Sequence, residues 1–264
     1  YITWASWPNC RVTRIAANGE MSPGWGGNGI VVATGAVGPY CMPPVSDGSG
    51  GVLLSWYNGG GLEVGYDVFV QRIKGDKTLV WADGNPSGGV KVSGGTFHET
   101  EPTVAADGNG GAFLVWEDRR AGVDFFDATK QEIYAAHILS TGARDPAWPA
   151  YWLRLGATDI GLQRLPRIMA DGAGGAYALW ENVPPGQFAV PEVRLVRVAG
   201  DGTFVAGWAE NGIVLAAELN GSMYDWRLVS DSELGAIAGW ILGAQGSYHV
   251  MATRVFNNGV APLQ

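Results

Sequence analysis

The chain has 264 residues, of which 47% are hydrophobic, and it carries a formal net charge of −8 with a sequence pI near 4.8. This acidic balance, together with the lack of a Lys/Arg cluster interleaved with aromatic residues, excludes nucleic acid as an expected partner. No uninterrupted apolar segment reaches the roughly 18 residues that a membrane-spanning helix needs, so we expect no membrane insertion. The 41 glycines and 14 prolines interrupt every helical periodicity, and the sequence therefore predicts an all-β fold.

The first 41 residues contain two apolar runs with strand character, residues 10–15 and 29–33, and both cysteines, Cys10 and Cys41. Two interpretations of the cysteines remain open, a disulfide in an exported protein or two buried free thiols. A metal site is not expected, because Cys-x-x-Cys spacing is absent and the chain has only three histidines. We expect no cofactor either.

A hairpin signal begins in the next segment and recurs along the chain. Its fullest form spans residues 101–120, where the apolar run 102–106 is followed by Asp107-Gly108-Asn109-Gly110 and a second apolar run, 111–116. The turn residues accept positive φ, so the pattern predicts two antiparallel strands joined by a tight turn.

Four copies of this signal share one spacing, because in each a tryptophan lies nine residues after an aspartate: Asp47 and Trp56, Asp107 and Trp116, Asp171 and Trp180, Asp231 and Trp240. We divide the single domain 1–264 into repeats at 1–41, 42–99, 100–163, 164–223 and 224–264. A period of this length that carries only strand signals is typical of propeller blades.

Each repeat also contains a third strand signal, and the first four repeats contain a fourth. The third strands are predicted at 10–15, 67–73, 132–139, 192–198 and 249–255, and their polar and apolar alternation favours a position near the outside of the blade. The fourth follows a turn and a further tryptophan. The sequence thus predicts a β-propeller of about five four-stranded blades, which either closes imperfectly or is part of a longer array.

The second strands are apolar at every position, a pattern of strands covered on both faces. We therefore expect Trp56, Trp116, Trp180 and Trp240 to fill the space between neighbouring blades.

The loops after these tryptophans differ in length from repeat to repeat, although the spacing from aspartate to tryptophan does not change. Insertions confined to one face of a repeat array mark its binding face. The expected ligand contacts on that face are Tyr57, Asn58, His98, Glu117, Asp118, Arg119, Arg120, Glu181 and Asn182.

The hairpin, the segment from Trp116 to Arg120 and the third-strand arginine resemble repeats of secreted bacterial β-propellers that share the architecture of sialidases. Residues 197–203, with Trp208 beyond, are similar in position to the Asp-box of bacterial neuraminidase repeats, although their spacing differs. By this resemblance, a sialidase would need three arginines that converge on a substrate carboxylate, a tyrosine nucleophile with a glutamate partner, and an aspartate as the acid/base. Arg119, Arg120 and Arg164 are the only arginines that we expect near one another at the loop face.

Two functions follow. The first is a non-catalytic extracellular or cell-surface module that binds a glycan or a surface protein through the variable loops, with no catalytic residues. The alternative is a glycoside hydrolase of sialidase-like or five-bladed type, which would use separated carboxylates on the loop face. Glu99, Glu117 and Glu181 are its candidates, with Glu101 beside them, and the sequence does not select two of the four.

Overall fold

The computed structural model describes residues 1–35, 37–59, 65–81, 88–94, 97–120, 131–156, 161–186, 189–217, 222–244 and 246–260. Within these residues every regular element is a β-strand. No helix that could cross a membrane occurs in this part of the chain.

The strands form five antiparallel sheets, which we number as blades 1 to 5 in chain order. Blade 1 consists of β1 (Ile2–Ser6), β2 (Asn9–Thr13) and β3 (Ile30–Thr34). Blade 2 consists of β4 (Tyr40–Cys41), β5 (Val45–Ser46), β6 (Val52–Gly59), β7 (Tyr66–Ile73) and β8 (Val90–Lys91). Blade 3 consists of β9 (Glu99–Ala106), β10 (Ala112–Asp118), β11 (Glu132–Ile138) and β12 (Leu153–Leu155).

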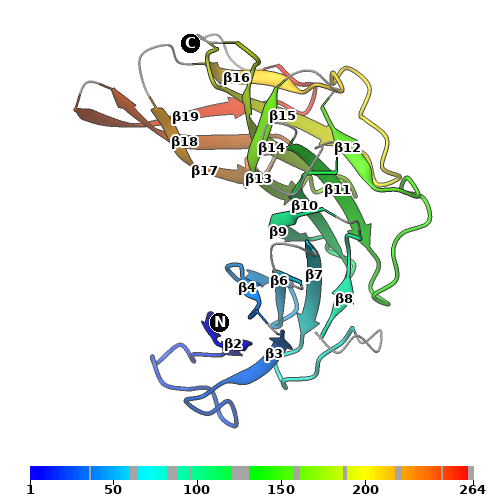
Figure 1. Ribbon diagram of the computed structural model, residues 1–264, viewed down its shortest axis with the longest axis vertical. Helices are drawn as coiled ribbons and strands as arrows, with labels where there is room; N and C mark the ends of the chain where they lie inside the picture. Colours follow the sequence, from blue (N-terminus) through cyan, green and yellow to red (C-terminus); the bar gives the residue numbers. More distant parts are fainter. Residues whose placement is uncertain are drawn as a thin grey trace.

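Blade 4 consists of β13 (Leu162–Ala170), β14 (Ala176–Val183), β15 (Glu192–Val198) and β16 (Ile213–Ala217). Blade 5 consists of β17 (Ser222–Ser230), β18 (Ala236–Ala244) and β19 (Ser247–Val255). Figure 1 shows the blades following one another along an arc, with blades 1 and 5 at its two ends. The prediction of an all-β propeller of about five blades is confirmed.

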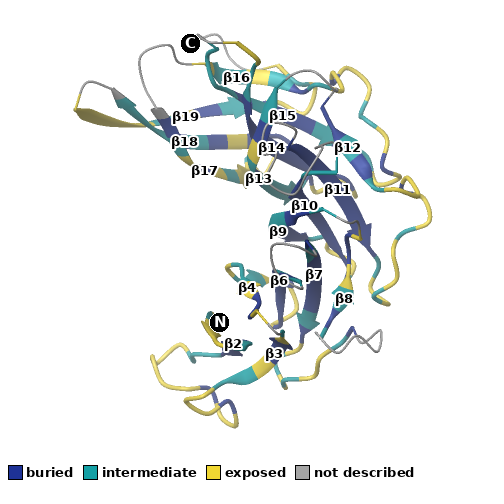
Figure 2. Cartoon of the chain, in the orientation of Figure 1, coloured by how far each residue is buried: buried dark blue, intermediate teal, exposed yellow. Residues whose placement is uncertain are grey.

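Apolar clusters occupy the interfaces between consecutive blades. Trp56, Trp116 and Trp180 are fully buried and Trp240 is 5% exposed, as their position on the second strands predicted. Figure 2 shows the burial concentrated in the central strands of blades 2, 3 and 4. The third strand of blade 3 differs from the expected alternation, because β11 is buried at every residue between β10 and β12.

The aspartate of each hairpin holds its own turn together. The Oδ1 atom of Asp171 accepts hydrogen bonds from the backbone N–H groups of Ala173 and Gly175, at 2.7 and 2.8 Å, and its Oδ2 atom accepts one from Arg197 Nε at 2.8 Å. A side chain at Gly175 would meet the carbonyl oxygen of Val198 at 2.2 Å. The turn therefore needs both the carboxylate and the glycine.

Equivalent contacts occur in the other hairpins, as ion pairs between Asp47 and Arg72 and between Asp231 and Arg254, and as a hydrogen bond between Asp107 and His137. This explains why the sequence pairs a turn aspartate with a basic residue on the third strand. The turn and the start of the link to the fourth strand lie at one end of each blade, opposite the loops between the second and third strands.

At that same end, a tryptophan joins each blade to the next. The indole Nε1–H groups of the tryptophans that follow the third strands donate to backbone carbonyls of the following blade: Trp25 to Gly75, Trp81 to Ser140, Trp148 to Gly200 and Trp208 to Asn257, at 2.9–3.2 Å. Each acceptor lies three residues after the third-strand Arg or His. The joint is therefore part of the repeat.

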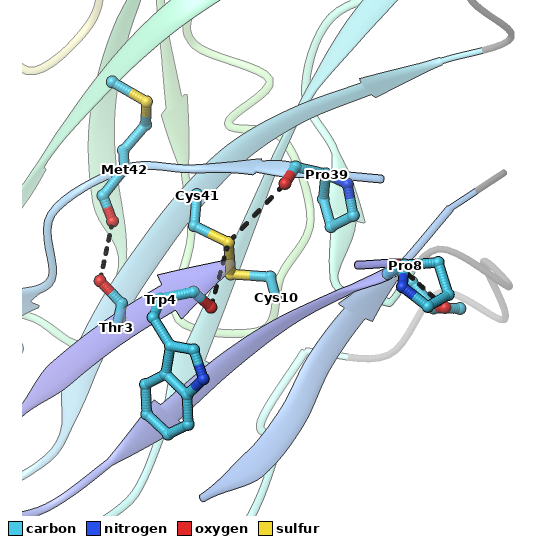
Figure 3. The surroundings of a disulfide bond; sticks show 8 residues. Thr3, Trp4, Pro8, Cys10, Pro39, Cys41 and Met42 are labelled. Atoms are coloured by element: carbon cyan, nitrogen blue, oxygen red, sulfur yellow. Dashed lines mark hydrogen bonds between the residues drawn. A yellow bond between two sulfur atoms is a disulfide. The ribbon is translucent and has the colours of Figure 1, made fainter. Parts of the chain in front are cut away.

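A disulfide between Cys10 and Cys41 links β2 of blade 1 to β4 of blade 2, with the two Cα atoms 5.9 Å apart (Figure 3). Of the two interpretations of the cysteines, the structure contains the bonded one. Blades 1 and 2 are consequently joined covalently as well as by Trp25.

We expect Asp171→Ala to lower the free energy of unfolding by about 3 kcal/mol, because it leaves Arg197 and two turn N–H groups without their acceptor. Chemical denaturation would measure the loss. Asp201→Ala is the matched control, since Asp201 is an exposed turn residue of the same blade and its side chain bonds Thr203 alone among the described residues. Equal losses in the two variants would contradict the proposed anchoring.

Candidate functional site

A cavity of about 350 Å³ opens between blades 2 and 3 at the loop end of the propeller. It is lined by Tyr40, Tyr57, Tyr66, His98, Thr100, Glu101, Glu117 and Arg119. Four of the predicted contact residues are therefore brought together here, namely Tyr57, His98, Glu117 and Arg119. A volume of this size suits a small ligand or one unit of a larger one.

The first strands of blades 3, 4 and 5 each contain a β-bulge, and the bulge of blade 3 positions Glu101. Glu101, Leu165 and Asp225 lie six residues before the turn aspartates of blades 3, 4 and 5, and all three have positive φ, at 52°, 56° and 57°. The strand register shifts at each of them. Such bulges re-aim a side chain at the cost of backbone strain. In blade 3 the Glu101 carboxylate reaches blade 2, where it accepts a hydrogen bond from the Tyr57 hydroxyl at 3.3 Å.

Glu117 is the residue directly after Trp116 on β10, and only 6% of it is exposed. Its Oε1 atom accepts a hydrogen bond from the backbone N–H of Leu165, the bulge residue of blade 4, at 2.8 Å. Burial raises the pKa of Glu117 to about 7; the Leu165 N–H opposes the rise, and the nearby charge of Glu101 adds to it. Glu117 is therefore able to carry a proton near neutral pH.

Three tyrosines form one wall of the cavity. The rings of Tyr40 and Tyr57 stack with centroids 4.6 Å apart and an interplanar angle of 7°, and Tyr66 meets both edge-on. Burial, with Glu101 nearby, raises the pKa of Tyr57 well above its usual range. Tyr40 is 49% exposed, so part of the stack presents an aromatic surface to a ligand.

One basic side chain, Arg119, also lines the cavity. The Arg119 backbone N–H donates to the His98 carbonyl, and its guanidinium Nε donates to Gln131 Oε1, each at 3.1 Å. Burial, together with the charge of Arg119, lowers the pKa of His98. The cavity thus combines aromatic rings, two carboxyl groups and one guanidinium.

Glu99, a predicted catalytic alternative, does not line this cavity. Its side chain is fully buried; Oε2 accepts a hydrogen bond from Ser93 Oγ at 3.2 Å, and Oε1 has no hydrogen-bond partner among the described residues. Burial raises its pKa to about 8, with the charges of Asp118 and Asp67 contributing. Glu99 is therefore buried between blades 2 and 3.

Asp118 and Arg120, both predicted ligand contacts, are paired within blade 3. Asp118 is fully buried and accepts hydrogen bonds from Trp116 Nε1 at 3.0 Å and Arg120 Nε at 2.8 Å. The Arg120 guanidinium lies over the rings of Tyr134 and Trp152, 4.1 and 4.7 Å from their centroids. Asp118 and Arg120, which the sequence suggested as ligand contacts, therefore pack within the blade instead.

The remaining predicted contacts also lie outside the cavity lining. Asn58 donates to the Thr34 carbonyl and Asn182 to Glu192, both at 3.3 Å. Glu181 is buried and forms an ion pair with Arg164. The sequence placed all three at the loop end, but their packing partners determine where the side chains point.

Tyr40 and Thr100 were missed by the sequence analysis, and so was Trp7, which lines a second cavity that shares Tyr40, Tyr57 and Glu101 with the first. One signal was present for Trp7, because it occupies none of the repeated tryptophan positions. Among the described residues, no cluster of three or more His, Cys, Asp or Glu is placed to hold a metal ion.

No protein-family model matches the chain, and no curated protein matches it. Similar solved structures include a GH43 endo-arabinanase from Bacillus licheniformis, at 10% identity, covering 98% of this chain and 91% of that one, with a TM-score of 0.45. An exo-1,5-α-L-arabinanase from a bovine ruminal metagenomic library is 13% identical, with 85% and 78% covered and a TM-score of 0.47.

An α-L-arabinofuranosidase from Lactobacillus brevis is 9% identical, with 85% of this chain and 75% of that one covered and a TM-score of 0.47. The five sheets by themselves define this chain as a β-propeller, and similarities at these identities assign no activity to it.

We expect Glu99→Gln to remove a pH dependence of stability. The pKa of Glu99 is raised to about 8 in the folded state, which means that folding favours its protonated form. The contribution of Glu99 to the free energy of unfolding is therefore fully present below its unfolded-state pKa and is lost as pH rises through about 8. The amide needs no proton, so the variant gains on the order of 2–5 kcal/mol over the parent at alkaline pH. Chemical denaturation at several pH values measures this; parallel curves for parent and variant would disprove it.

Proposed function

We propose that the protein is a glycoside hydrolase and that Glu117 and Glu101 are its catalytic carboxyl groups. One observation carries the proposal: a single cavity holds two carboxyl groups in different environments. Glu117 is buried with its pKa raised to about 7, whereas Glu101 accepts a hydrogen bond from Tyr57, an arrangement that suits a carboxylate. Such a difference between two neighbouring carboxyl groups separates the acid from the base.

In the proposed reaction, Glu117 donates its proton to the glycosidic oxygen as the bond between that oxygen and the anomeric carbon breaks. A water molecule bonds to the anomeric carbon and gives its proton to Glu101. Proton exchange with solvent then restores both groups. The Leu165 N–H and the Tyr57 hydroxyl orient the two side chains through their hydrogen bonds.

A sialidase-type reaction is less well supported. The cavity holds a Tyr–Glu pair and Arg119, but the described lining residues include no aspartate, and Arg164 is paired with Glu181. Hydrolysis by two carboxyl groups needs only residues that line the cavity.

We expect Glu117→Gln and Glu101→Gln each to lower kcat/KM by at least about 100-fold, since each removes one proton-transfer group. A panel of aryl glycosides together with arabinan, xylan and mannan would reveal the parent activity. The exposed Glu210 provides the control, and Glu210→Gln should leave turnover unchanged. Full activity in either cavity variant, or no turnover of any substrate by the parent, would overturn the assignment.

The pH profile gives a second expected result. Glu117 must be protonated to act as the acid, so kcat/KM should fall as pH rises above about 7. Measurement of kcat/KM for the parent from about pH 5 to about pH 9 tests this. A profile that rises through that range would show that Glu117 is not the acid.

A second candidate function is non-catalytic glycan binding, which the half-exposed Tyr40 ring stacked on Tyr57 favours. In that case Tyr40→Ala would abolish glycan binding while Glu117→Gln would not. Isothermal titration with the same saccharide panel separates this function from hydrolysis.

A further inference from the structure

A second cavity, of about 500 Å³, lies between blades 1 and 2 beside the Glu117 cavity. Tyr40, Tyr57 and Glu101 line both cavities, so the two share one wall. Trp7, Ala5 and Met42 are among the residues found only in the second cavity. The two cavities therefore lie side by side across blades 1, 2 and 3, and we call them together the groove.

Trp7 departs from every other tryptophan of the chain. All twelve lie in the described residues, and Trp7 is the only one of them that is exposed, at 74%. It occupies the turn between β1 and β2, and a side chain at Gly38 would meet its Cδ1 atom at 2.7 Å. The indole thus lies against the Gly38 backbone with its remaining surface open to solvent. The other eleven tryptophans are buried or half-buried, so the packing role that they share does not explain Trp7.

Ala5 explains why there is space beside Trp7. It follows Trp4, and the residues that follow the corresponding tryptophans of blades 2 and 3 are Tyr57 and Glu117. The small side chain leaves open the volume that a tyrosine or glutamate fills in those blades. Ala5 pairs with Cys10, and Cys41, the disulfide partner of Cys10 (Figure 3), also lines this cavity.

The lining of the second cavity indicates the chemistry of its occupant. Apart from Glu101, no described residue that lines it is charged, and its aromatic groups are Trp7, Tyr40 and Tyr57. Neutral sugar rings place their C–H faces on aromatic rings and their hydroxyls in water, whereas an anionic sugar would meet only a carboxylate here. The net charge of −8 also opposes a polyanionic chain.

We infer that the groove binds a neutral polysaccharide chain, with consecutive units on the Trp7 and Tyr40 rings and the linkage to be cleaved at Glu101 and Glu117. This inference rests on the proposed function for the cleavage step, but chain binding is measurable without it. Trp7 binds the polysaccharide and takes no part in proton transfer.

Affinity electrophoresis in gels that contain arabinan, xylan, mannan or polygalacturonate tests the inference. We expect at least one neutral polymer to retard the parent and Trp7→Ala to weaken that retardation about 10-fold in dissociation constant. Trp7→Tyr, which keeps an aromatic ring, should restore most of the affinity. Tyr151→Ala is the control, because Tyr151 is 81% exposed but lines neither cavity.

Acrylamide quenching of tryptophan fluorescence supplies a second readout. The exposed Trp7 should dominate quenching in the parent, and the retarding polymer should protect it. Unchanged retardation in Trp7→Ala, no retardation of the parent, or retardation by polygalacturonate alone would overturn the inference. If the parent hydrolyses aryl glycosides but Trp7→Ala does not change retardation by polymers, the inference of chain binding fails and the proposed hydrolase stands. If retardation depends on Trp7 but no substrate is turned over, chain binding is supported and the proposed hydrolase is refuted.

Discussion

The hydrogen bond from an indole N–H to a carbonyl of the following blade recurs at all four steps from blade 1 to blade 5. Each of these tryptophans is almost fully buried, so the bond forms where water does not compete and apolar packing surrounds it. Because the donor and the acceptor occupy the same repeat positions every time, each blade is placed on its neighbour by the same geometry. A cavity shared by two or three blades depends on that repetition.

The candidate site uses the freedom that this repetition leaves. The second-strand tryptophan is half-buried in blade 1 and fully buried in blades 2 and 3, whereas the residue after it is alanine, tyrosine and glutamate in these three blades. Ala5 opens space, Tyr57 supplies a ring and a hydroxyl, and Glu117 supplies a buried carboxyl group. The same repeat position thus contributes open space in blade 1, an aromatic ring in blade 2 and a carboxyl group in blade 3 to the groove.

Much of the architecture followed from the sequence, because the Asp-to-Trp spacing and the third-strand Arg or His are local patterns with local causes. The site followed only in part. Glu117 was among the candidates, but Glu101 was not separated from its neighbours, since its direction depends on a bulge with positive φ. Asp118 and Arg120 resembled a binding motif until Tyr134 and Trp152 were seen to enclose the arginine. Tertiary contacts, which no local pattern encodes, decided these cases.

The aspartate contacts of the hairpin turns and the indole bonds lie at one end of the blades, and the groove lies at the other end. Mutations that lengthen or replace a loop beside the groove leave the joints between blades untouched. A chain built in this way is able to diversify its ligands by loop exchange among related repeats while its scaffold stays the same. Its most variable surface is then the one on which selection for a new ligand would act.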